Sequence, residues 1–172
     1  ADFKQFAETF AALKKTGKPI VVVLFTGRPL VLTNDIDKTD ALLNVWFPGS
    51  EAGYAITDVL FGDVNPSAKL SATFPRSLGQ VPIFYNHKNT GRPLANKEGK
   101  FEKFRSNYID ERNEPLFPFG FGLSYTKFDY SNLKLSTEKI NTNQKMTVSV
   151  DVKNSGNYDG KEVIQLYIRD MV

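Results

Sequence analysis

The sequence PIVVVLF, at residues Pro19–Phe25, is apolar throughout and rich in β-branched residues, and the turn TGRP follows it at Thr26–Pro29. Central strands of parallel sheets have this composition, because helices cover both faces of such a sheet. The run therefore predicts a strand that is buried above and below.

Segments with helical spacing lie on both sides of this strand. Apolar residues recur at intervals of three and four over Phe3–Leu13, and Gly17 suits a helix end. A second apolar run at Ala41–Phe47 predicts another strand, and helical spacing returns at Ala52–Leu60. Lys69–Phe74 alternates between polar and apolar residues, as a half-buried strand does. This order of elements predicts an α/β layer structure.

The character of the chain changes after this α/β pattern. Residues 75–118 are rich in proline, glycine and aromatic residues, which predicts a long, ordered but irregular connection. Alternating apolar residues then occur at Met146–Val152 and at Ile164–Ile168, with the turn formers of Asn154–Gly160 between them. We predict two antiparallel strands around this turn, in a β-sandwich of the immunoglobulin kind. Such a sandwich needs about seven strands, so this one would be incomplete.

Composition excludes several classes of site. The chain has 172 residues with 41% hydrophobic and 24% charged residues, as expected for a folded protein. The lysines and arginines are scattered, which argues against a nucleic-acid partner, and no apolar run is long enough to span a membrane. Without cysteine there is no thiol chemistry, and the single histidine, His87, has no neighbours that suggest a metal site or a catalytic triad. We predict no metal and no cofactor.

A candidate ligand site lies where the first two predicted strands end. Ligands of open α/β sheets bind beyond the carboxyl ends of the strands. A sugar site needs charged side chains for the hydroxyls and an aromatic ring for the sugar face, and Arg28, Trp46, Glu51 and Tyr54 would supply this set. Each has a structural alternative as well. The helix dipole alone favours Glu51 in a first turn, Arg28 could simply pair with a carboxylate, and Trp46 could belong to the core.

Several motifs follow one another along the chain: GRPL at 27–30, WFPGSEAG at 46–53, DVLFGDVNPSAKL at 58–70, FPRSLGQVP at 74–82, YNH at 85–87, TGRP at 90–93 and PLFPFGFGLSY at 115–125. Together they resemble glycoside hydrolase family 3, and within it the bacterial periplasmic β-glucosidases. One small departure is Ala52, which stands where the family motif commonly has a glycine. The segment from Asn154 to Asp170 resembles the start of the fibronectin type III-like domain of these enzymes.

The resemblance implies a domain organisation and a mechanism. Residues 1–118 would be a C-terminal α/β sandwich domain, incomplete at its N-terminus and including the connection at 75–118, and residues 119–172 a fibronectin type III-like domain, incomplete at its C-terminus. The implied mechanism is retaining, with two carboxylates about 5–5.5 Å apart. The nucleophilic Asp would belong to an N-terminal TIM-like barrel and the acid/base Glu would also precede Ala1, so no catalytic residue is predicted within this chain.

The implied function is that of a retaining exo-β-glucosidase fragment, which would be inactive alone and would serve carbohydrate catabolism by releasing terminal non-reducing β-D-glucosyl residues. Its expected partners are a β-linked oligosaccharide or glucoside and the barrel domain of the same protein, with a homodimer as an option. The expected location is periplasmic or extracellular. One alternative is a non-catalytic carbohydrate-binding or scaffold module. The other is a family relative that acts on β-xylosides or β-N-acetylglucosaminides.

Overall fold

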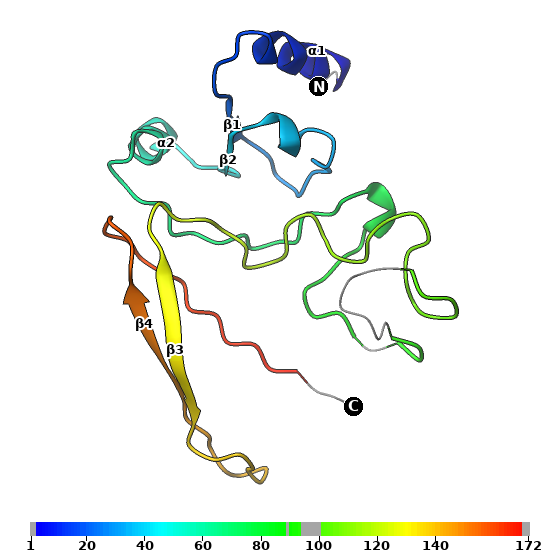
Figure 1. The fold of residues 1–172 in the computed structure, drawn as a ribbon, viewed down its shortest axis with the longest axis vertical. Coiled ribbons are helices and arrows are strands. Elements are labelled where there is room, and N and C mark those ends of the chain that lie inside the picture. Colours follow the sequence, from blue (N-terminus) through cyan, green and yellow to red (C-terminus); the bar gives the residue numbers. More distant parts are fainter. Residues whose placement is uncertain (1–2, 89, 94–100, 170–172) are drawn as a thin grey trace. The chain divides into compact units, whose positions relative to one another are not determined.

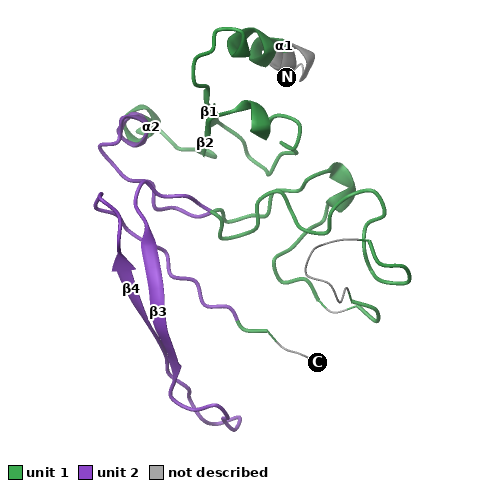
Figure 2. Ribbon diagram, in the orientation of Figure 1, with its two compact units in different colours: residues 1–56, 70–121, 168–172 green, residues 57–69, 122–167 purple. Residues whose placement is uncertain are grey.

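The structure is a computed structural model that describes residues 3–88, 90–93 and 101–169 (Figure 1). Its residues group into two compact units, one made of residues 1–56, 70–121 and 168–172 and the other of residues 57–69 and 122–167 (Figure 2). We call them unit 1 and unit 2. The helices and strands are α1 (Phe3–Lys14), β1 (Val21–Leu24), β2 (Ala41–Asn44), α2 (Ala52–Phe61), β3 (Phe128–Leu135) and β4 (Val148–Asn154).

Unit 1 contains a parallel pair of strands. β1 pairs with β2 in a register that runs from Val21 opposite Ala41 to Leu24 opposite Asn44. The pairing continues one residue further, because the Val45 amide donates to the Leu24 carbonyl at 3.0 Å. Both predicted strands and their parallel arrangement are therefore confirmed.

The two predicted helices are also present, and glycines end them. Gly17 follows α1 with a φ of 66°, and Gly62 follows α2 with a φ of 88°. Only glycine adopts this left-handed conformation without strain, which explains why each helix stops there.

The prediction that β1 is buried on both faces is wrong. Val21 is 51% exposed and Phe25, just beyond the strand, is 60% exposed, although Ile20 is buried. In the described residues the sheet has only two strands, so the strand has no neighbour on one side. The apolar run thus reports β propensity correctly but overstates burial.

The strand predicted at Lys69–Phe74 is not continuous. Leu70 exchanges backbone hydrogen bonds with Gly120 and Phe121 at 2.7 and 2.8 Å, and the Phe74 amide donates to the Phe117 carbonyl at 2.8 Å. A bend at residues 71–72 separates these two points of contact, so only an isolated bridge forms. Phe74 is nonetheless 1% exposed, as its place on the apolar side of the alternation predicts. The rest of the connection is irregular in its described part, as predicted, with one 3-10 helix at Leu78–Gln80.

Unit 2 contains an antiparallel pair, β3 and β4, which lie side by side in Figure 1. The strand predicted at Met146–Val152 is confirmed as β4, but the one predicted at Ile164–Ile168 is wrong. Residues 155–169 contain no strand, and Ile168 is 93% exposed. The described residues form a single two-stranded sheet in this unit, and the sandwich stays a prediction.

Packing of the predicted turn explains why the chain does not fold back along β4. The Asn154 side chain accepts hydrogen bonds from the Thr126 hydroxyl at 2.7 Å and from the Gly156 amide at 3.1 Å. A Cβ at Gly156 would lie 2.3 Å from the Thr126 hydroxyl oxygen, so the two segments are in close contact. The turn residues are therefore directed toward the start of β3, and β4 takes β3 as its partner.

Candidate functional site

The carboxyl ends of β1 and β2 lie at one edge of the parallel pair, and the turns that follow them are in contact. A Cβ at Gly27 would lie 2.6 Å from the tip of the Phe47 ring, so only glycine fits at this position. In the same turn the Thr26 hydroxyl donates to the Arg28 carbonyl at 2.7 Å and accepts from the Arg28 amide at 3.3 Å. The buried Thr26 side chain therefore fixes the turn that carries Arg28.

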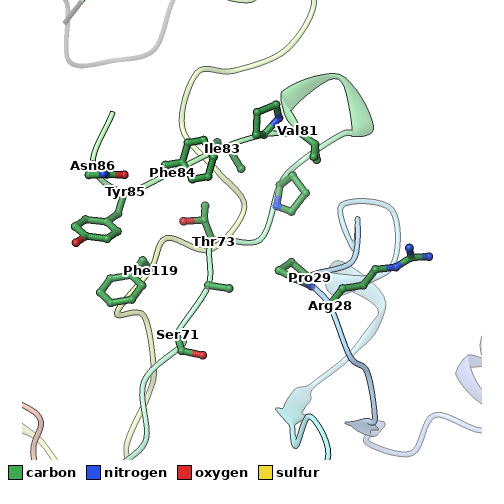
Figure 3. A pocket seen from close by; sticks show the side chains of 13 residues that line it. Arg28, Pro29, Ser71, Thr73, Val81, Ile83, Phe84, Tyr85, Asn86 and Phe119 are labelled. Atoms are coloured by element: carbon green, nitrogen blue, oxygen red, sulfur yellow. The ribbon is translucent and has the colours of Figure 1, made fainter. Parts of the chain in front are cut away.

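Arg28 lines a pocket of about 510 Å³ within unit 1. In Figure 3 its side chain extends away from the stacked rings of Tyr85 and Phe119, so its backbone and stem, rather than its guanidinium, face the cavity. The remaining lining residues are Pro29, Ser71, Ala72, Thr73, Pro75, Val81, Pro82, Ile83, Phe84, Tyr85, Asn86 and Phe119.

Trp46 packs against the core of unit 1. Its ring centroid lies 5.8 Å from that of the buried Phe74, with the planes at 49°. Phe74 in turn makes an edge contact with Phe117 at 6.4 Å, and Phe117 stacks on Phe121 at 5.0 Å. Trp46 also has a φ of 50°, which is uncommon for a residue with a side chain. The half-buried ring therefore serves the core on at least one face.

Glu51 and Tyr54 lie at the start of α2. Glu51 is exposed and its carbonyl accepts the Ala55 amide at 3.2 Å, as expected for a residue at the beginning of a helix. Tyr54 is 77% exposed. Of the four predicted residues only Arg28 lines the pocket, and their joint role in substrate binding stays a prediction.

Asn44 is a polar residue that the sequence analysis missed. It is the last residue of β2, and its side-chain nitrogen and oxygen are both buried without a hydrogen-bond partner among the described residues. An unpaired buried amide is costly and therefore rare in folded proteins. Its position as the single polar residue in the apolar run Ala41–Phe47 was the available clue.

The pocket residues after Pro29 were also missed. They come from the predicted strand at 69–74 and from the irregular connection, where periodicity gives no information on which side chains converge. The density of aromatic residues, with Phe84, Tyr85 and Phe119 in the wall, was the one clue in the sequence.

Shifted ionisation occurs in unit 2 rather than at this pocket. A hydrogen bond from Ser155, together with the nearby Lys127, holds the pKa of Asp129 below its ordinary value of 3.8, against a smaller opposing effect of desolvation. Desolvation and a hydrogen bond to Glu162 raise the pKa of Tyr130 above 10.0. In the part of the chain that the structure covers, no three His, Asp or Glu side chains gather as metal ligands would. Nor does any described helix have the length and apolarity that crossing a membrane requires.

Comparison with known proteins gives the family. The family model described as glycosyl hydrolase family 3 C-terminal domain matches residues 3–125. The chain belongs to glycosyl hydrolase family 3. The predicted resemblance is thereby confirmed, and the matched residues include α1, both strands of the parallel pair, α2 and the whole pocket.

Relatives in this family have names of two kinds. The chain is 52% identical over 164 residues to a protein of Salmonella typhimurium named periplasmic beta-glucosidase, covering 95% of the chain and 21% of that protein. It is 45% identical over 163 residues to a beta-xylosidase of Formosa agariphila, again covering 95% of the chain and 21% of the relative.

Solved structures of relatives contain the same fold. The beta-glucosidase from Listeria innocua in complex with glucose matches with a TM-score of 0.89 at 44% identity, over 96% of this chain and 23% of that one. The chain therefore spans about a fifth of the length of the relatives it matches.

Proposed function

We propose that this chain is the C-terminal part of a retaining exo-β-glucosidase that releases terminal β-D-glucosyl residues from short oligosaccharides or glucosides. The observation that carries the proposal is the match of the family 3 C-terminal domain over residues 3–125, together with 52% identity to a protein named periplasmic beta-glucosidase. The proposed location is correspondingly the periplasm or the cell exterior.

The proposed division of labour leaves the chemistry to another part of the protein. The relatives are about five times as long as this chain, and we propose that a barrel domain supplies the nucleophilic Asp, while the acid/base Glu also precedes Ala1. Residues 1–118 would then close one side of the sugar pocket, with Arg28, Glu51 and Tyr54 toward the hydroxyls and Trp46 toward the ring. Residues 119–172 would be a fibronectin type III-like scaffold.

A β-xylosidase is the second candidate, because two Formosa agariphila relatives at 45% and 36% identity are named beta-xylosidase and putative beta-xylosidase. Glucose differs from xylose by one hydroxymethyl group. A pocket discriminates such a difference by about 1–3 kcal/mol, or 10- to 200-fold in kcat/KM.

The test is to express the complete product of the gene and to measure kcat/KM on p-nitrophenyl β-glucoside and β-xyloside. We expect the glucoside to be preferred, and no hydrolysis by the 172-residue chain alone. Arg28→Ala in the complete protein should raise KM, whereas Glu138→Gln, at an exposed position of unit 2, should not.

Two results would contradict the proposal. One is a folded complete protein that prefers the xyloside or cleaves neither substrate. The other is turnover by the 172-residue chain alone that Glu51→Gln abolishes, since that would place a catalytic carboxylate inside this chain.

A further inference from the structure

The pocket of unit 1 has an aromatic wall that is fixed and yet open to solvent. The rings of Tyr85 and Phe119 stack with centroids 4.5 Å apart and planes at 24°, so each limits the motion of the other. Tyr85 nevertheless remains 61% exposed, and the neighbouring Phe84 63%. An exposed ring of this kind offers an apolar surface against which the C–H face of a pyranose can pack.

Beside this wall the pocket presents polar side chains that have no partner in the described residues. Neither the hydroxyls of Ser71 and Thr73 nor the amide of Asn86 makes a hydrogen bond within the described part of the chain. In Figure 3 Thr73 lies between the Tyr85–Phe119 pair on one side and Pro29 on the other. Hydroxyl and amide groups both donate and accept, as the hydroxyls of a sugar require of a binding site.

The loop that forms one wall is held in place from behind. Gln80 is 1% exposed, and its side chain accepts the Arg76 amide at 2.6 Å and donates to the Arg112 carbonyl at 2.7 Å. The Arg76 carbonyl also accepts the Thr33 hydroxyl at 2.7 Å. These bonds anchor the chain immediately before Val81, where the wall begins. A site whose walls are fixed before the ligand arrives loses less entropy on binding.

We infer that this pocket binds a saccharide directly, with a pyranose ring on Tyr85 and its hydroxyls on Thr73, Asn86 and Ser71. A volume of about 510 Å³ lies within the range of about 300–1,000 Å³ typical of small-molecule sites, which are mostly apolar with a few placed polar groups. The choice of a saccharide as ligand rests on the proposed function. The site itself goes beyond it, because binding here requires no catalytic carboxylate and shares only Arg28 with the four predicted substrate residues.

The experiment is a titration of the isotope-labelled 172-residue chain with cellobiose, followed by amide chemical shifts. We expect saturable shifts that are largest at Thr73, Tyr85 and Asn86. Tyr85→Ala should weaken binding about tenfold, because the ring supplies the apolar contact. Tyr158→Ala removes an equally exposed tyrosine from unit 2 and should leave the affinity unchanged.

Further arms make the outcome decisive. Asn86→Ala tests the polar side of the site and should also weaken binding, which matters if Tyr85→Ala disturbs the fold. Phenol serves as a probe with an apolar ring and a single hydroxyl. Binding of phenol without binding of cellobiose, shifts that map elsewhere, or an affinity indifferent to both Tyr85→Ala and Asn86→Ala would overturn the inference. Hydrolysis by the complete protein is measured separately, so failure of the pocket and failure of the proposed function give different results.

Discussion

Residues 70–121 of unit 1 and the β3–β4 pair of unit 2 differ in the opposite sense from what their secondary structure suggests. The described part of 70–121 is almost entirely irregular, yet it contains Phe74 and Gln80, each 1% exposed. The β3–β4 pair is a regular antiparallel ladder, yet every residue of β3 after Phe128 is exposed. Regular hydrogen bonding and burial are therefore separate properties in this chain.

The physical reason lies in what each kind of contact contributes. Backbone ladder bonds replace bonds to water, so their net contribution is modest, and a two-stranded hairpin without a covered face is marginal. Burial of a large aromatic ring removes apolar surface from water and contributes about 2–3 kcal/mol, to which close packing adds. We therefore expect the irregular segment to be the more sensitive of the two to substitution.

The largest effect is expected for Phe74→Ala. This change removes a fully buried ring that contacts Trp46 and Phe117, and it should lower the free energy of unfolding by about 4 kcal/mol. Leu133→Ala in β3 removes a side chain that is 70% exposed and should cost about 0.5 kcal/mol or less. Chemical denaturation followed by tryptophan fluorescence measures the first change, since Trp46 is the single tryptophan, and circular dichroism serves both. Equal losses for the two variants would contradict the comparison.

An intermediate effect is expected for Gln80→Leu. The leucine is of similar size but leaves the Arg76 amide and the Arg112 carbonyl without the partners that Gln80 provides, at a cost of about 2 kcal/mol. The matched control is Gln144→Leu. Gln144 also accepts a backbone amide, that of Asn141 at 2.8 Å, but in an exposed loop where water can replace it.

Both glutamine variants are compared by thermal unfolding. A loss confined to Gln80→Leu supports a structural role for the buried amide. A loss of similar size in Gln144→Leu would mean that burial does not decide the cost of a broken side-chain bond here.

These two regions also show what sequence patterns can predict. Period-two alternation found β4, helical spacing found α1 and α2, and β-branched composition found β1, because these elements are determined locally. The strand predicted at Ile164–Ile168 has the same alternation as β4 but no partner in the described residues. Strand pairing depends on residues distant in the chain, and the contacts of Asn154 with Thr126 and of Gly156 with its neighbours are such distant interactions.

Prediction of the site had a similar limit. The argument from the carboxyl ends of parallel strands correctly placed the turns at Gly27 and Phe47 at one edge, where they touch. It could not find Thr73, Tyr85 or Asn86, since they converge only through the irregular course of residues 70–121. It also could not show that Trp46 would pack on Phe74, because a tryptophan in an apolar run is compatible with both core and surface.

The smallest effect is expected at Asp129 in β3, and it tests whether exposed side-chain contacts in the regular region have any measurable consequence. The Ser155 hydroxyl and Lys127 favour the ionised carboxylate, so the pKa of Asp129 lies below 3.8 in the folded chain. A group with a lowered folded pKa stabilises the fold at pH values above its ordinary pKa, and this contribution is lost as the pH falls through the folded pKa. Ser155→Ala should therefore bring the pKa of Asp129 back toward 3.8, as measured by NMR titration of the carboxyl carbon. The Ser155 amide still donates to the Lys127 carbonyl at 2.8 Å in this variant, so the main chain stays in place, and Thr137→Ala serves as a control at a hydroxyl that bonds only locally. An unchanged pKa would show that the ladder alone, without its surface side chains, determines the environment of this carboxylate.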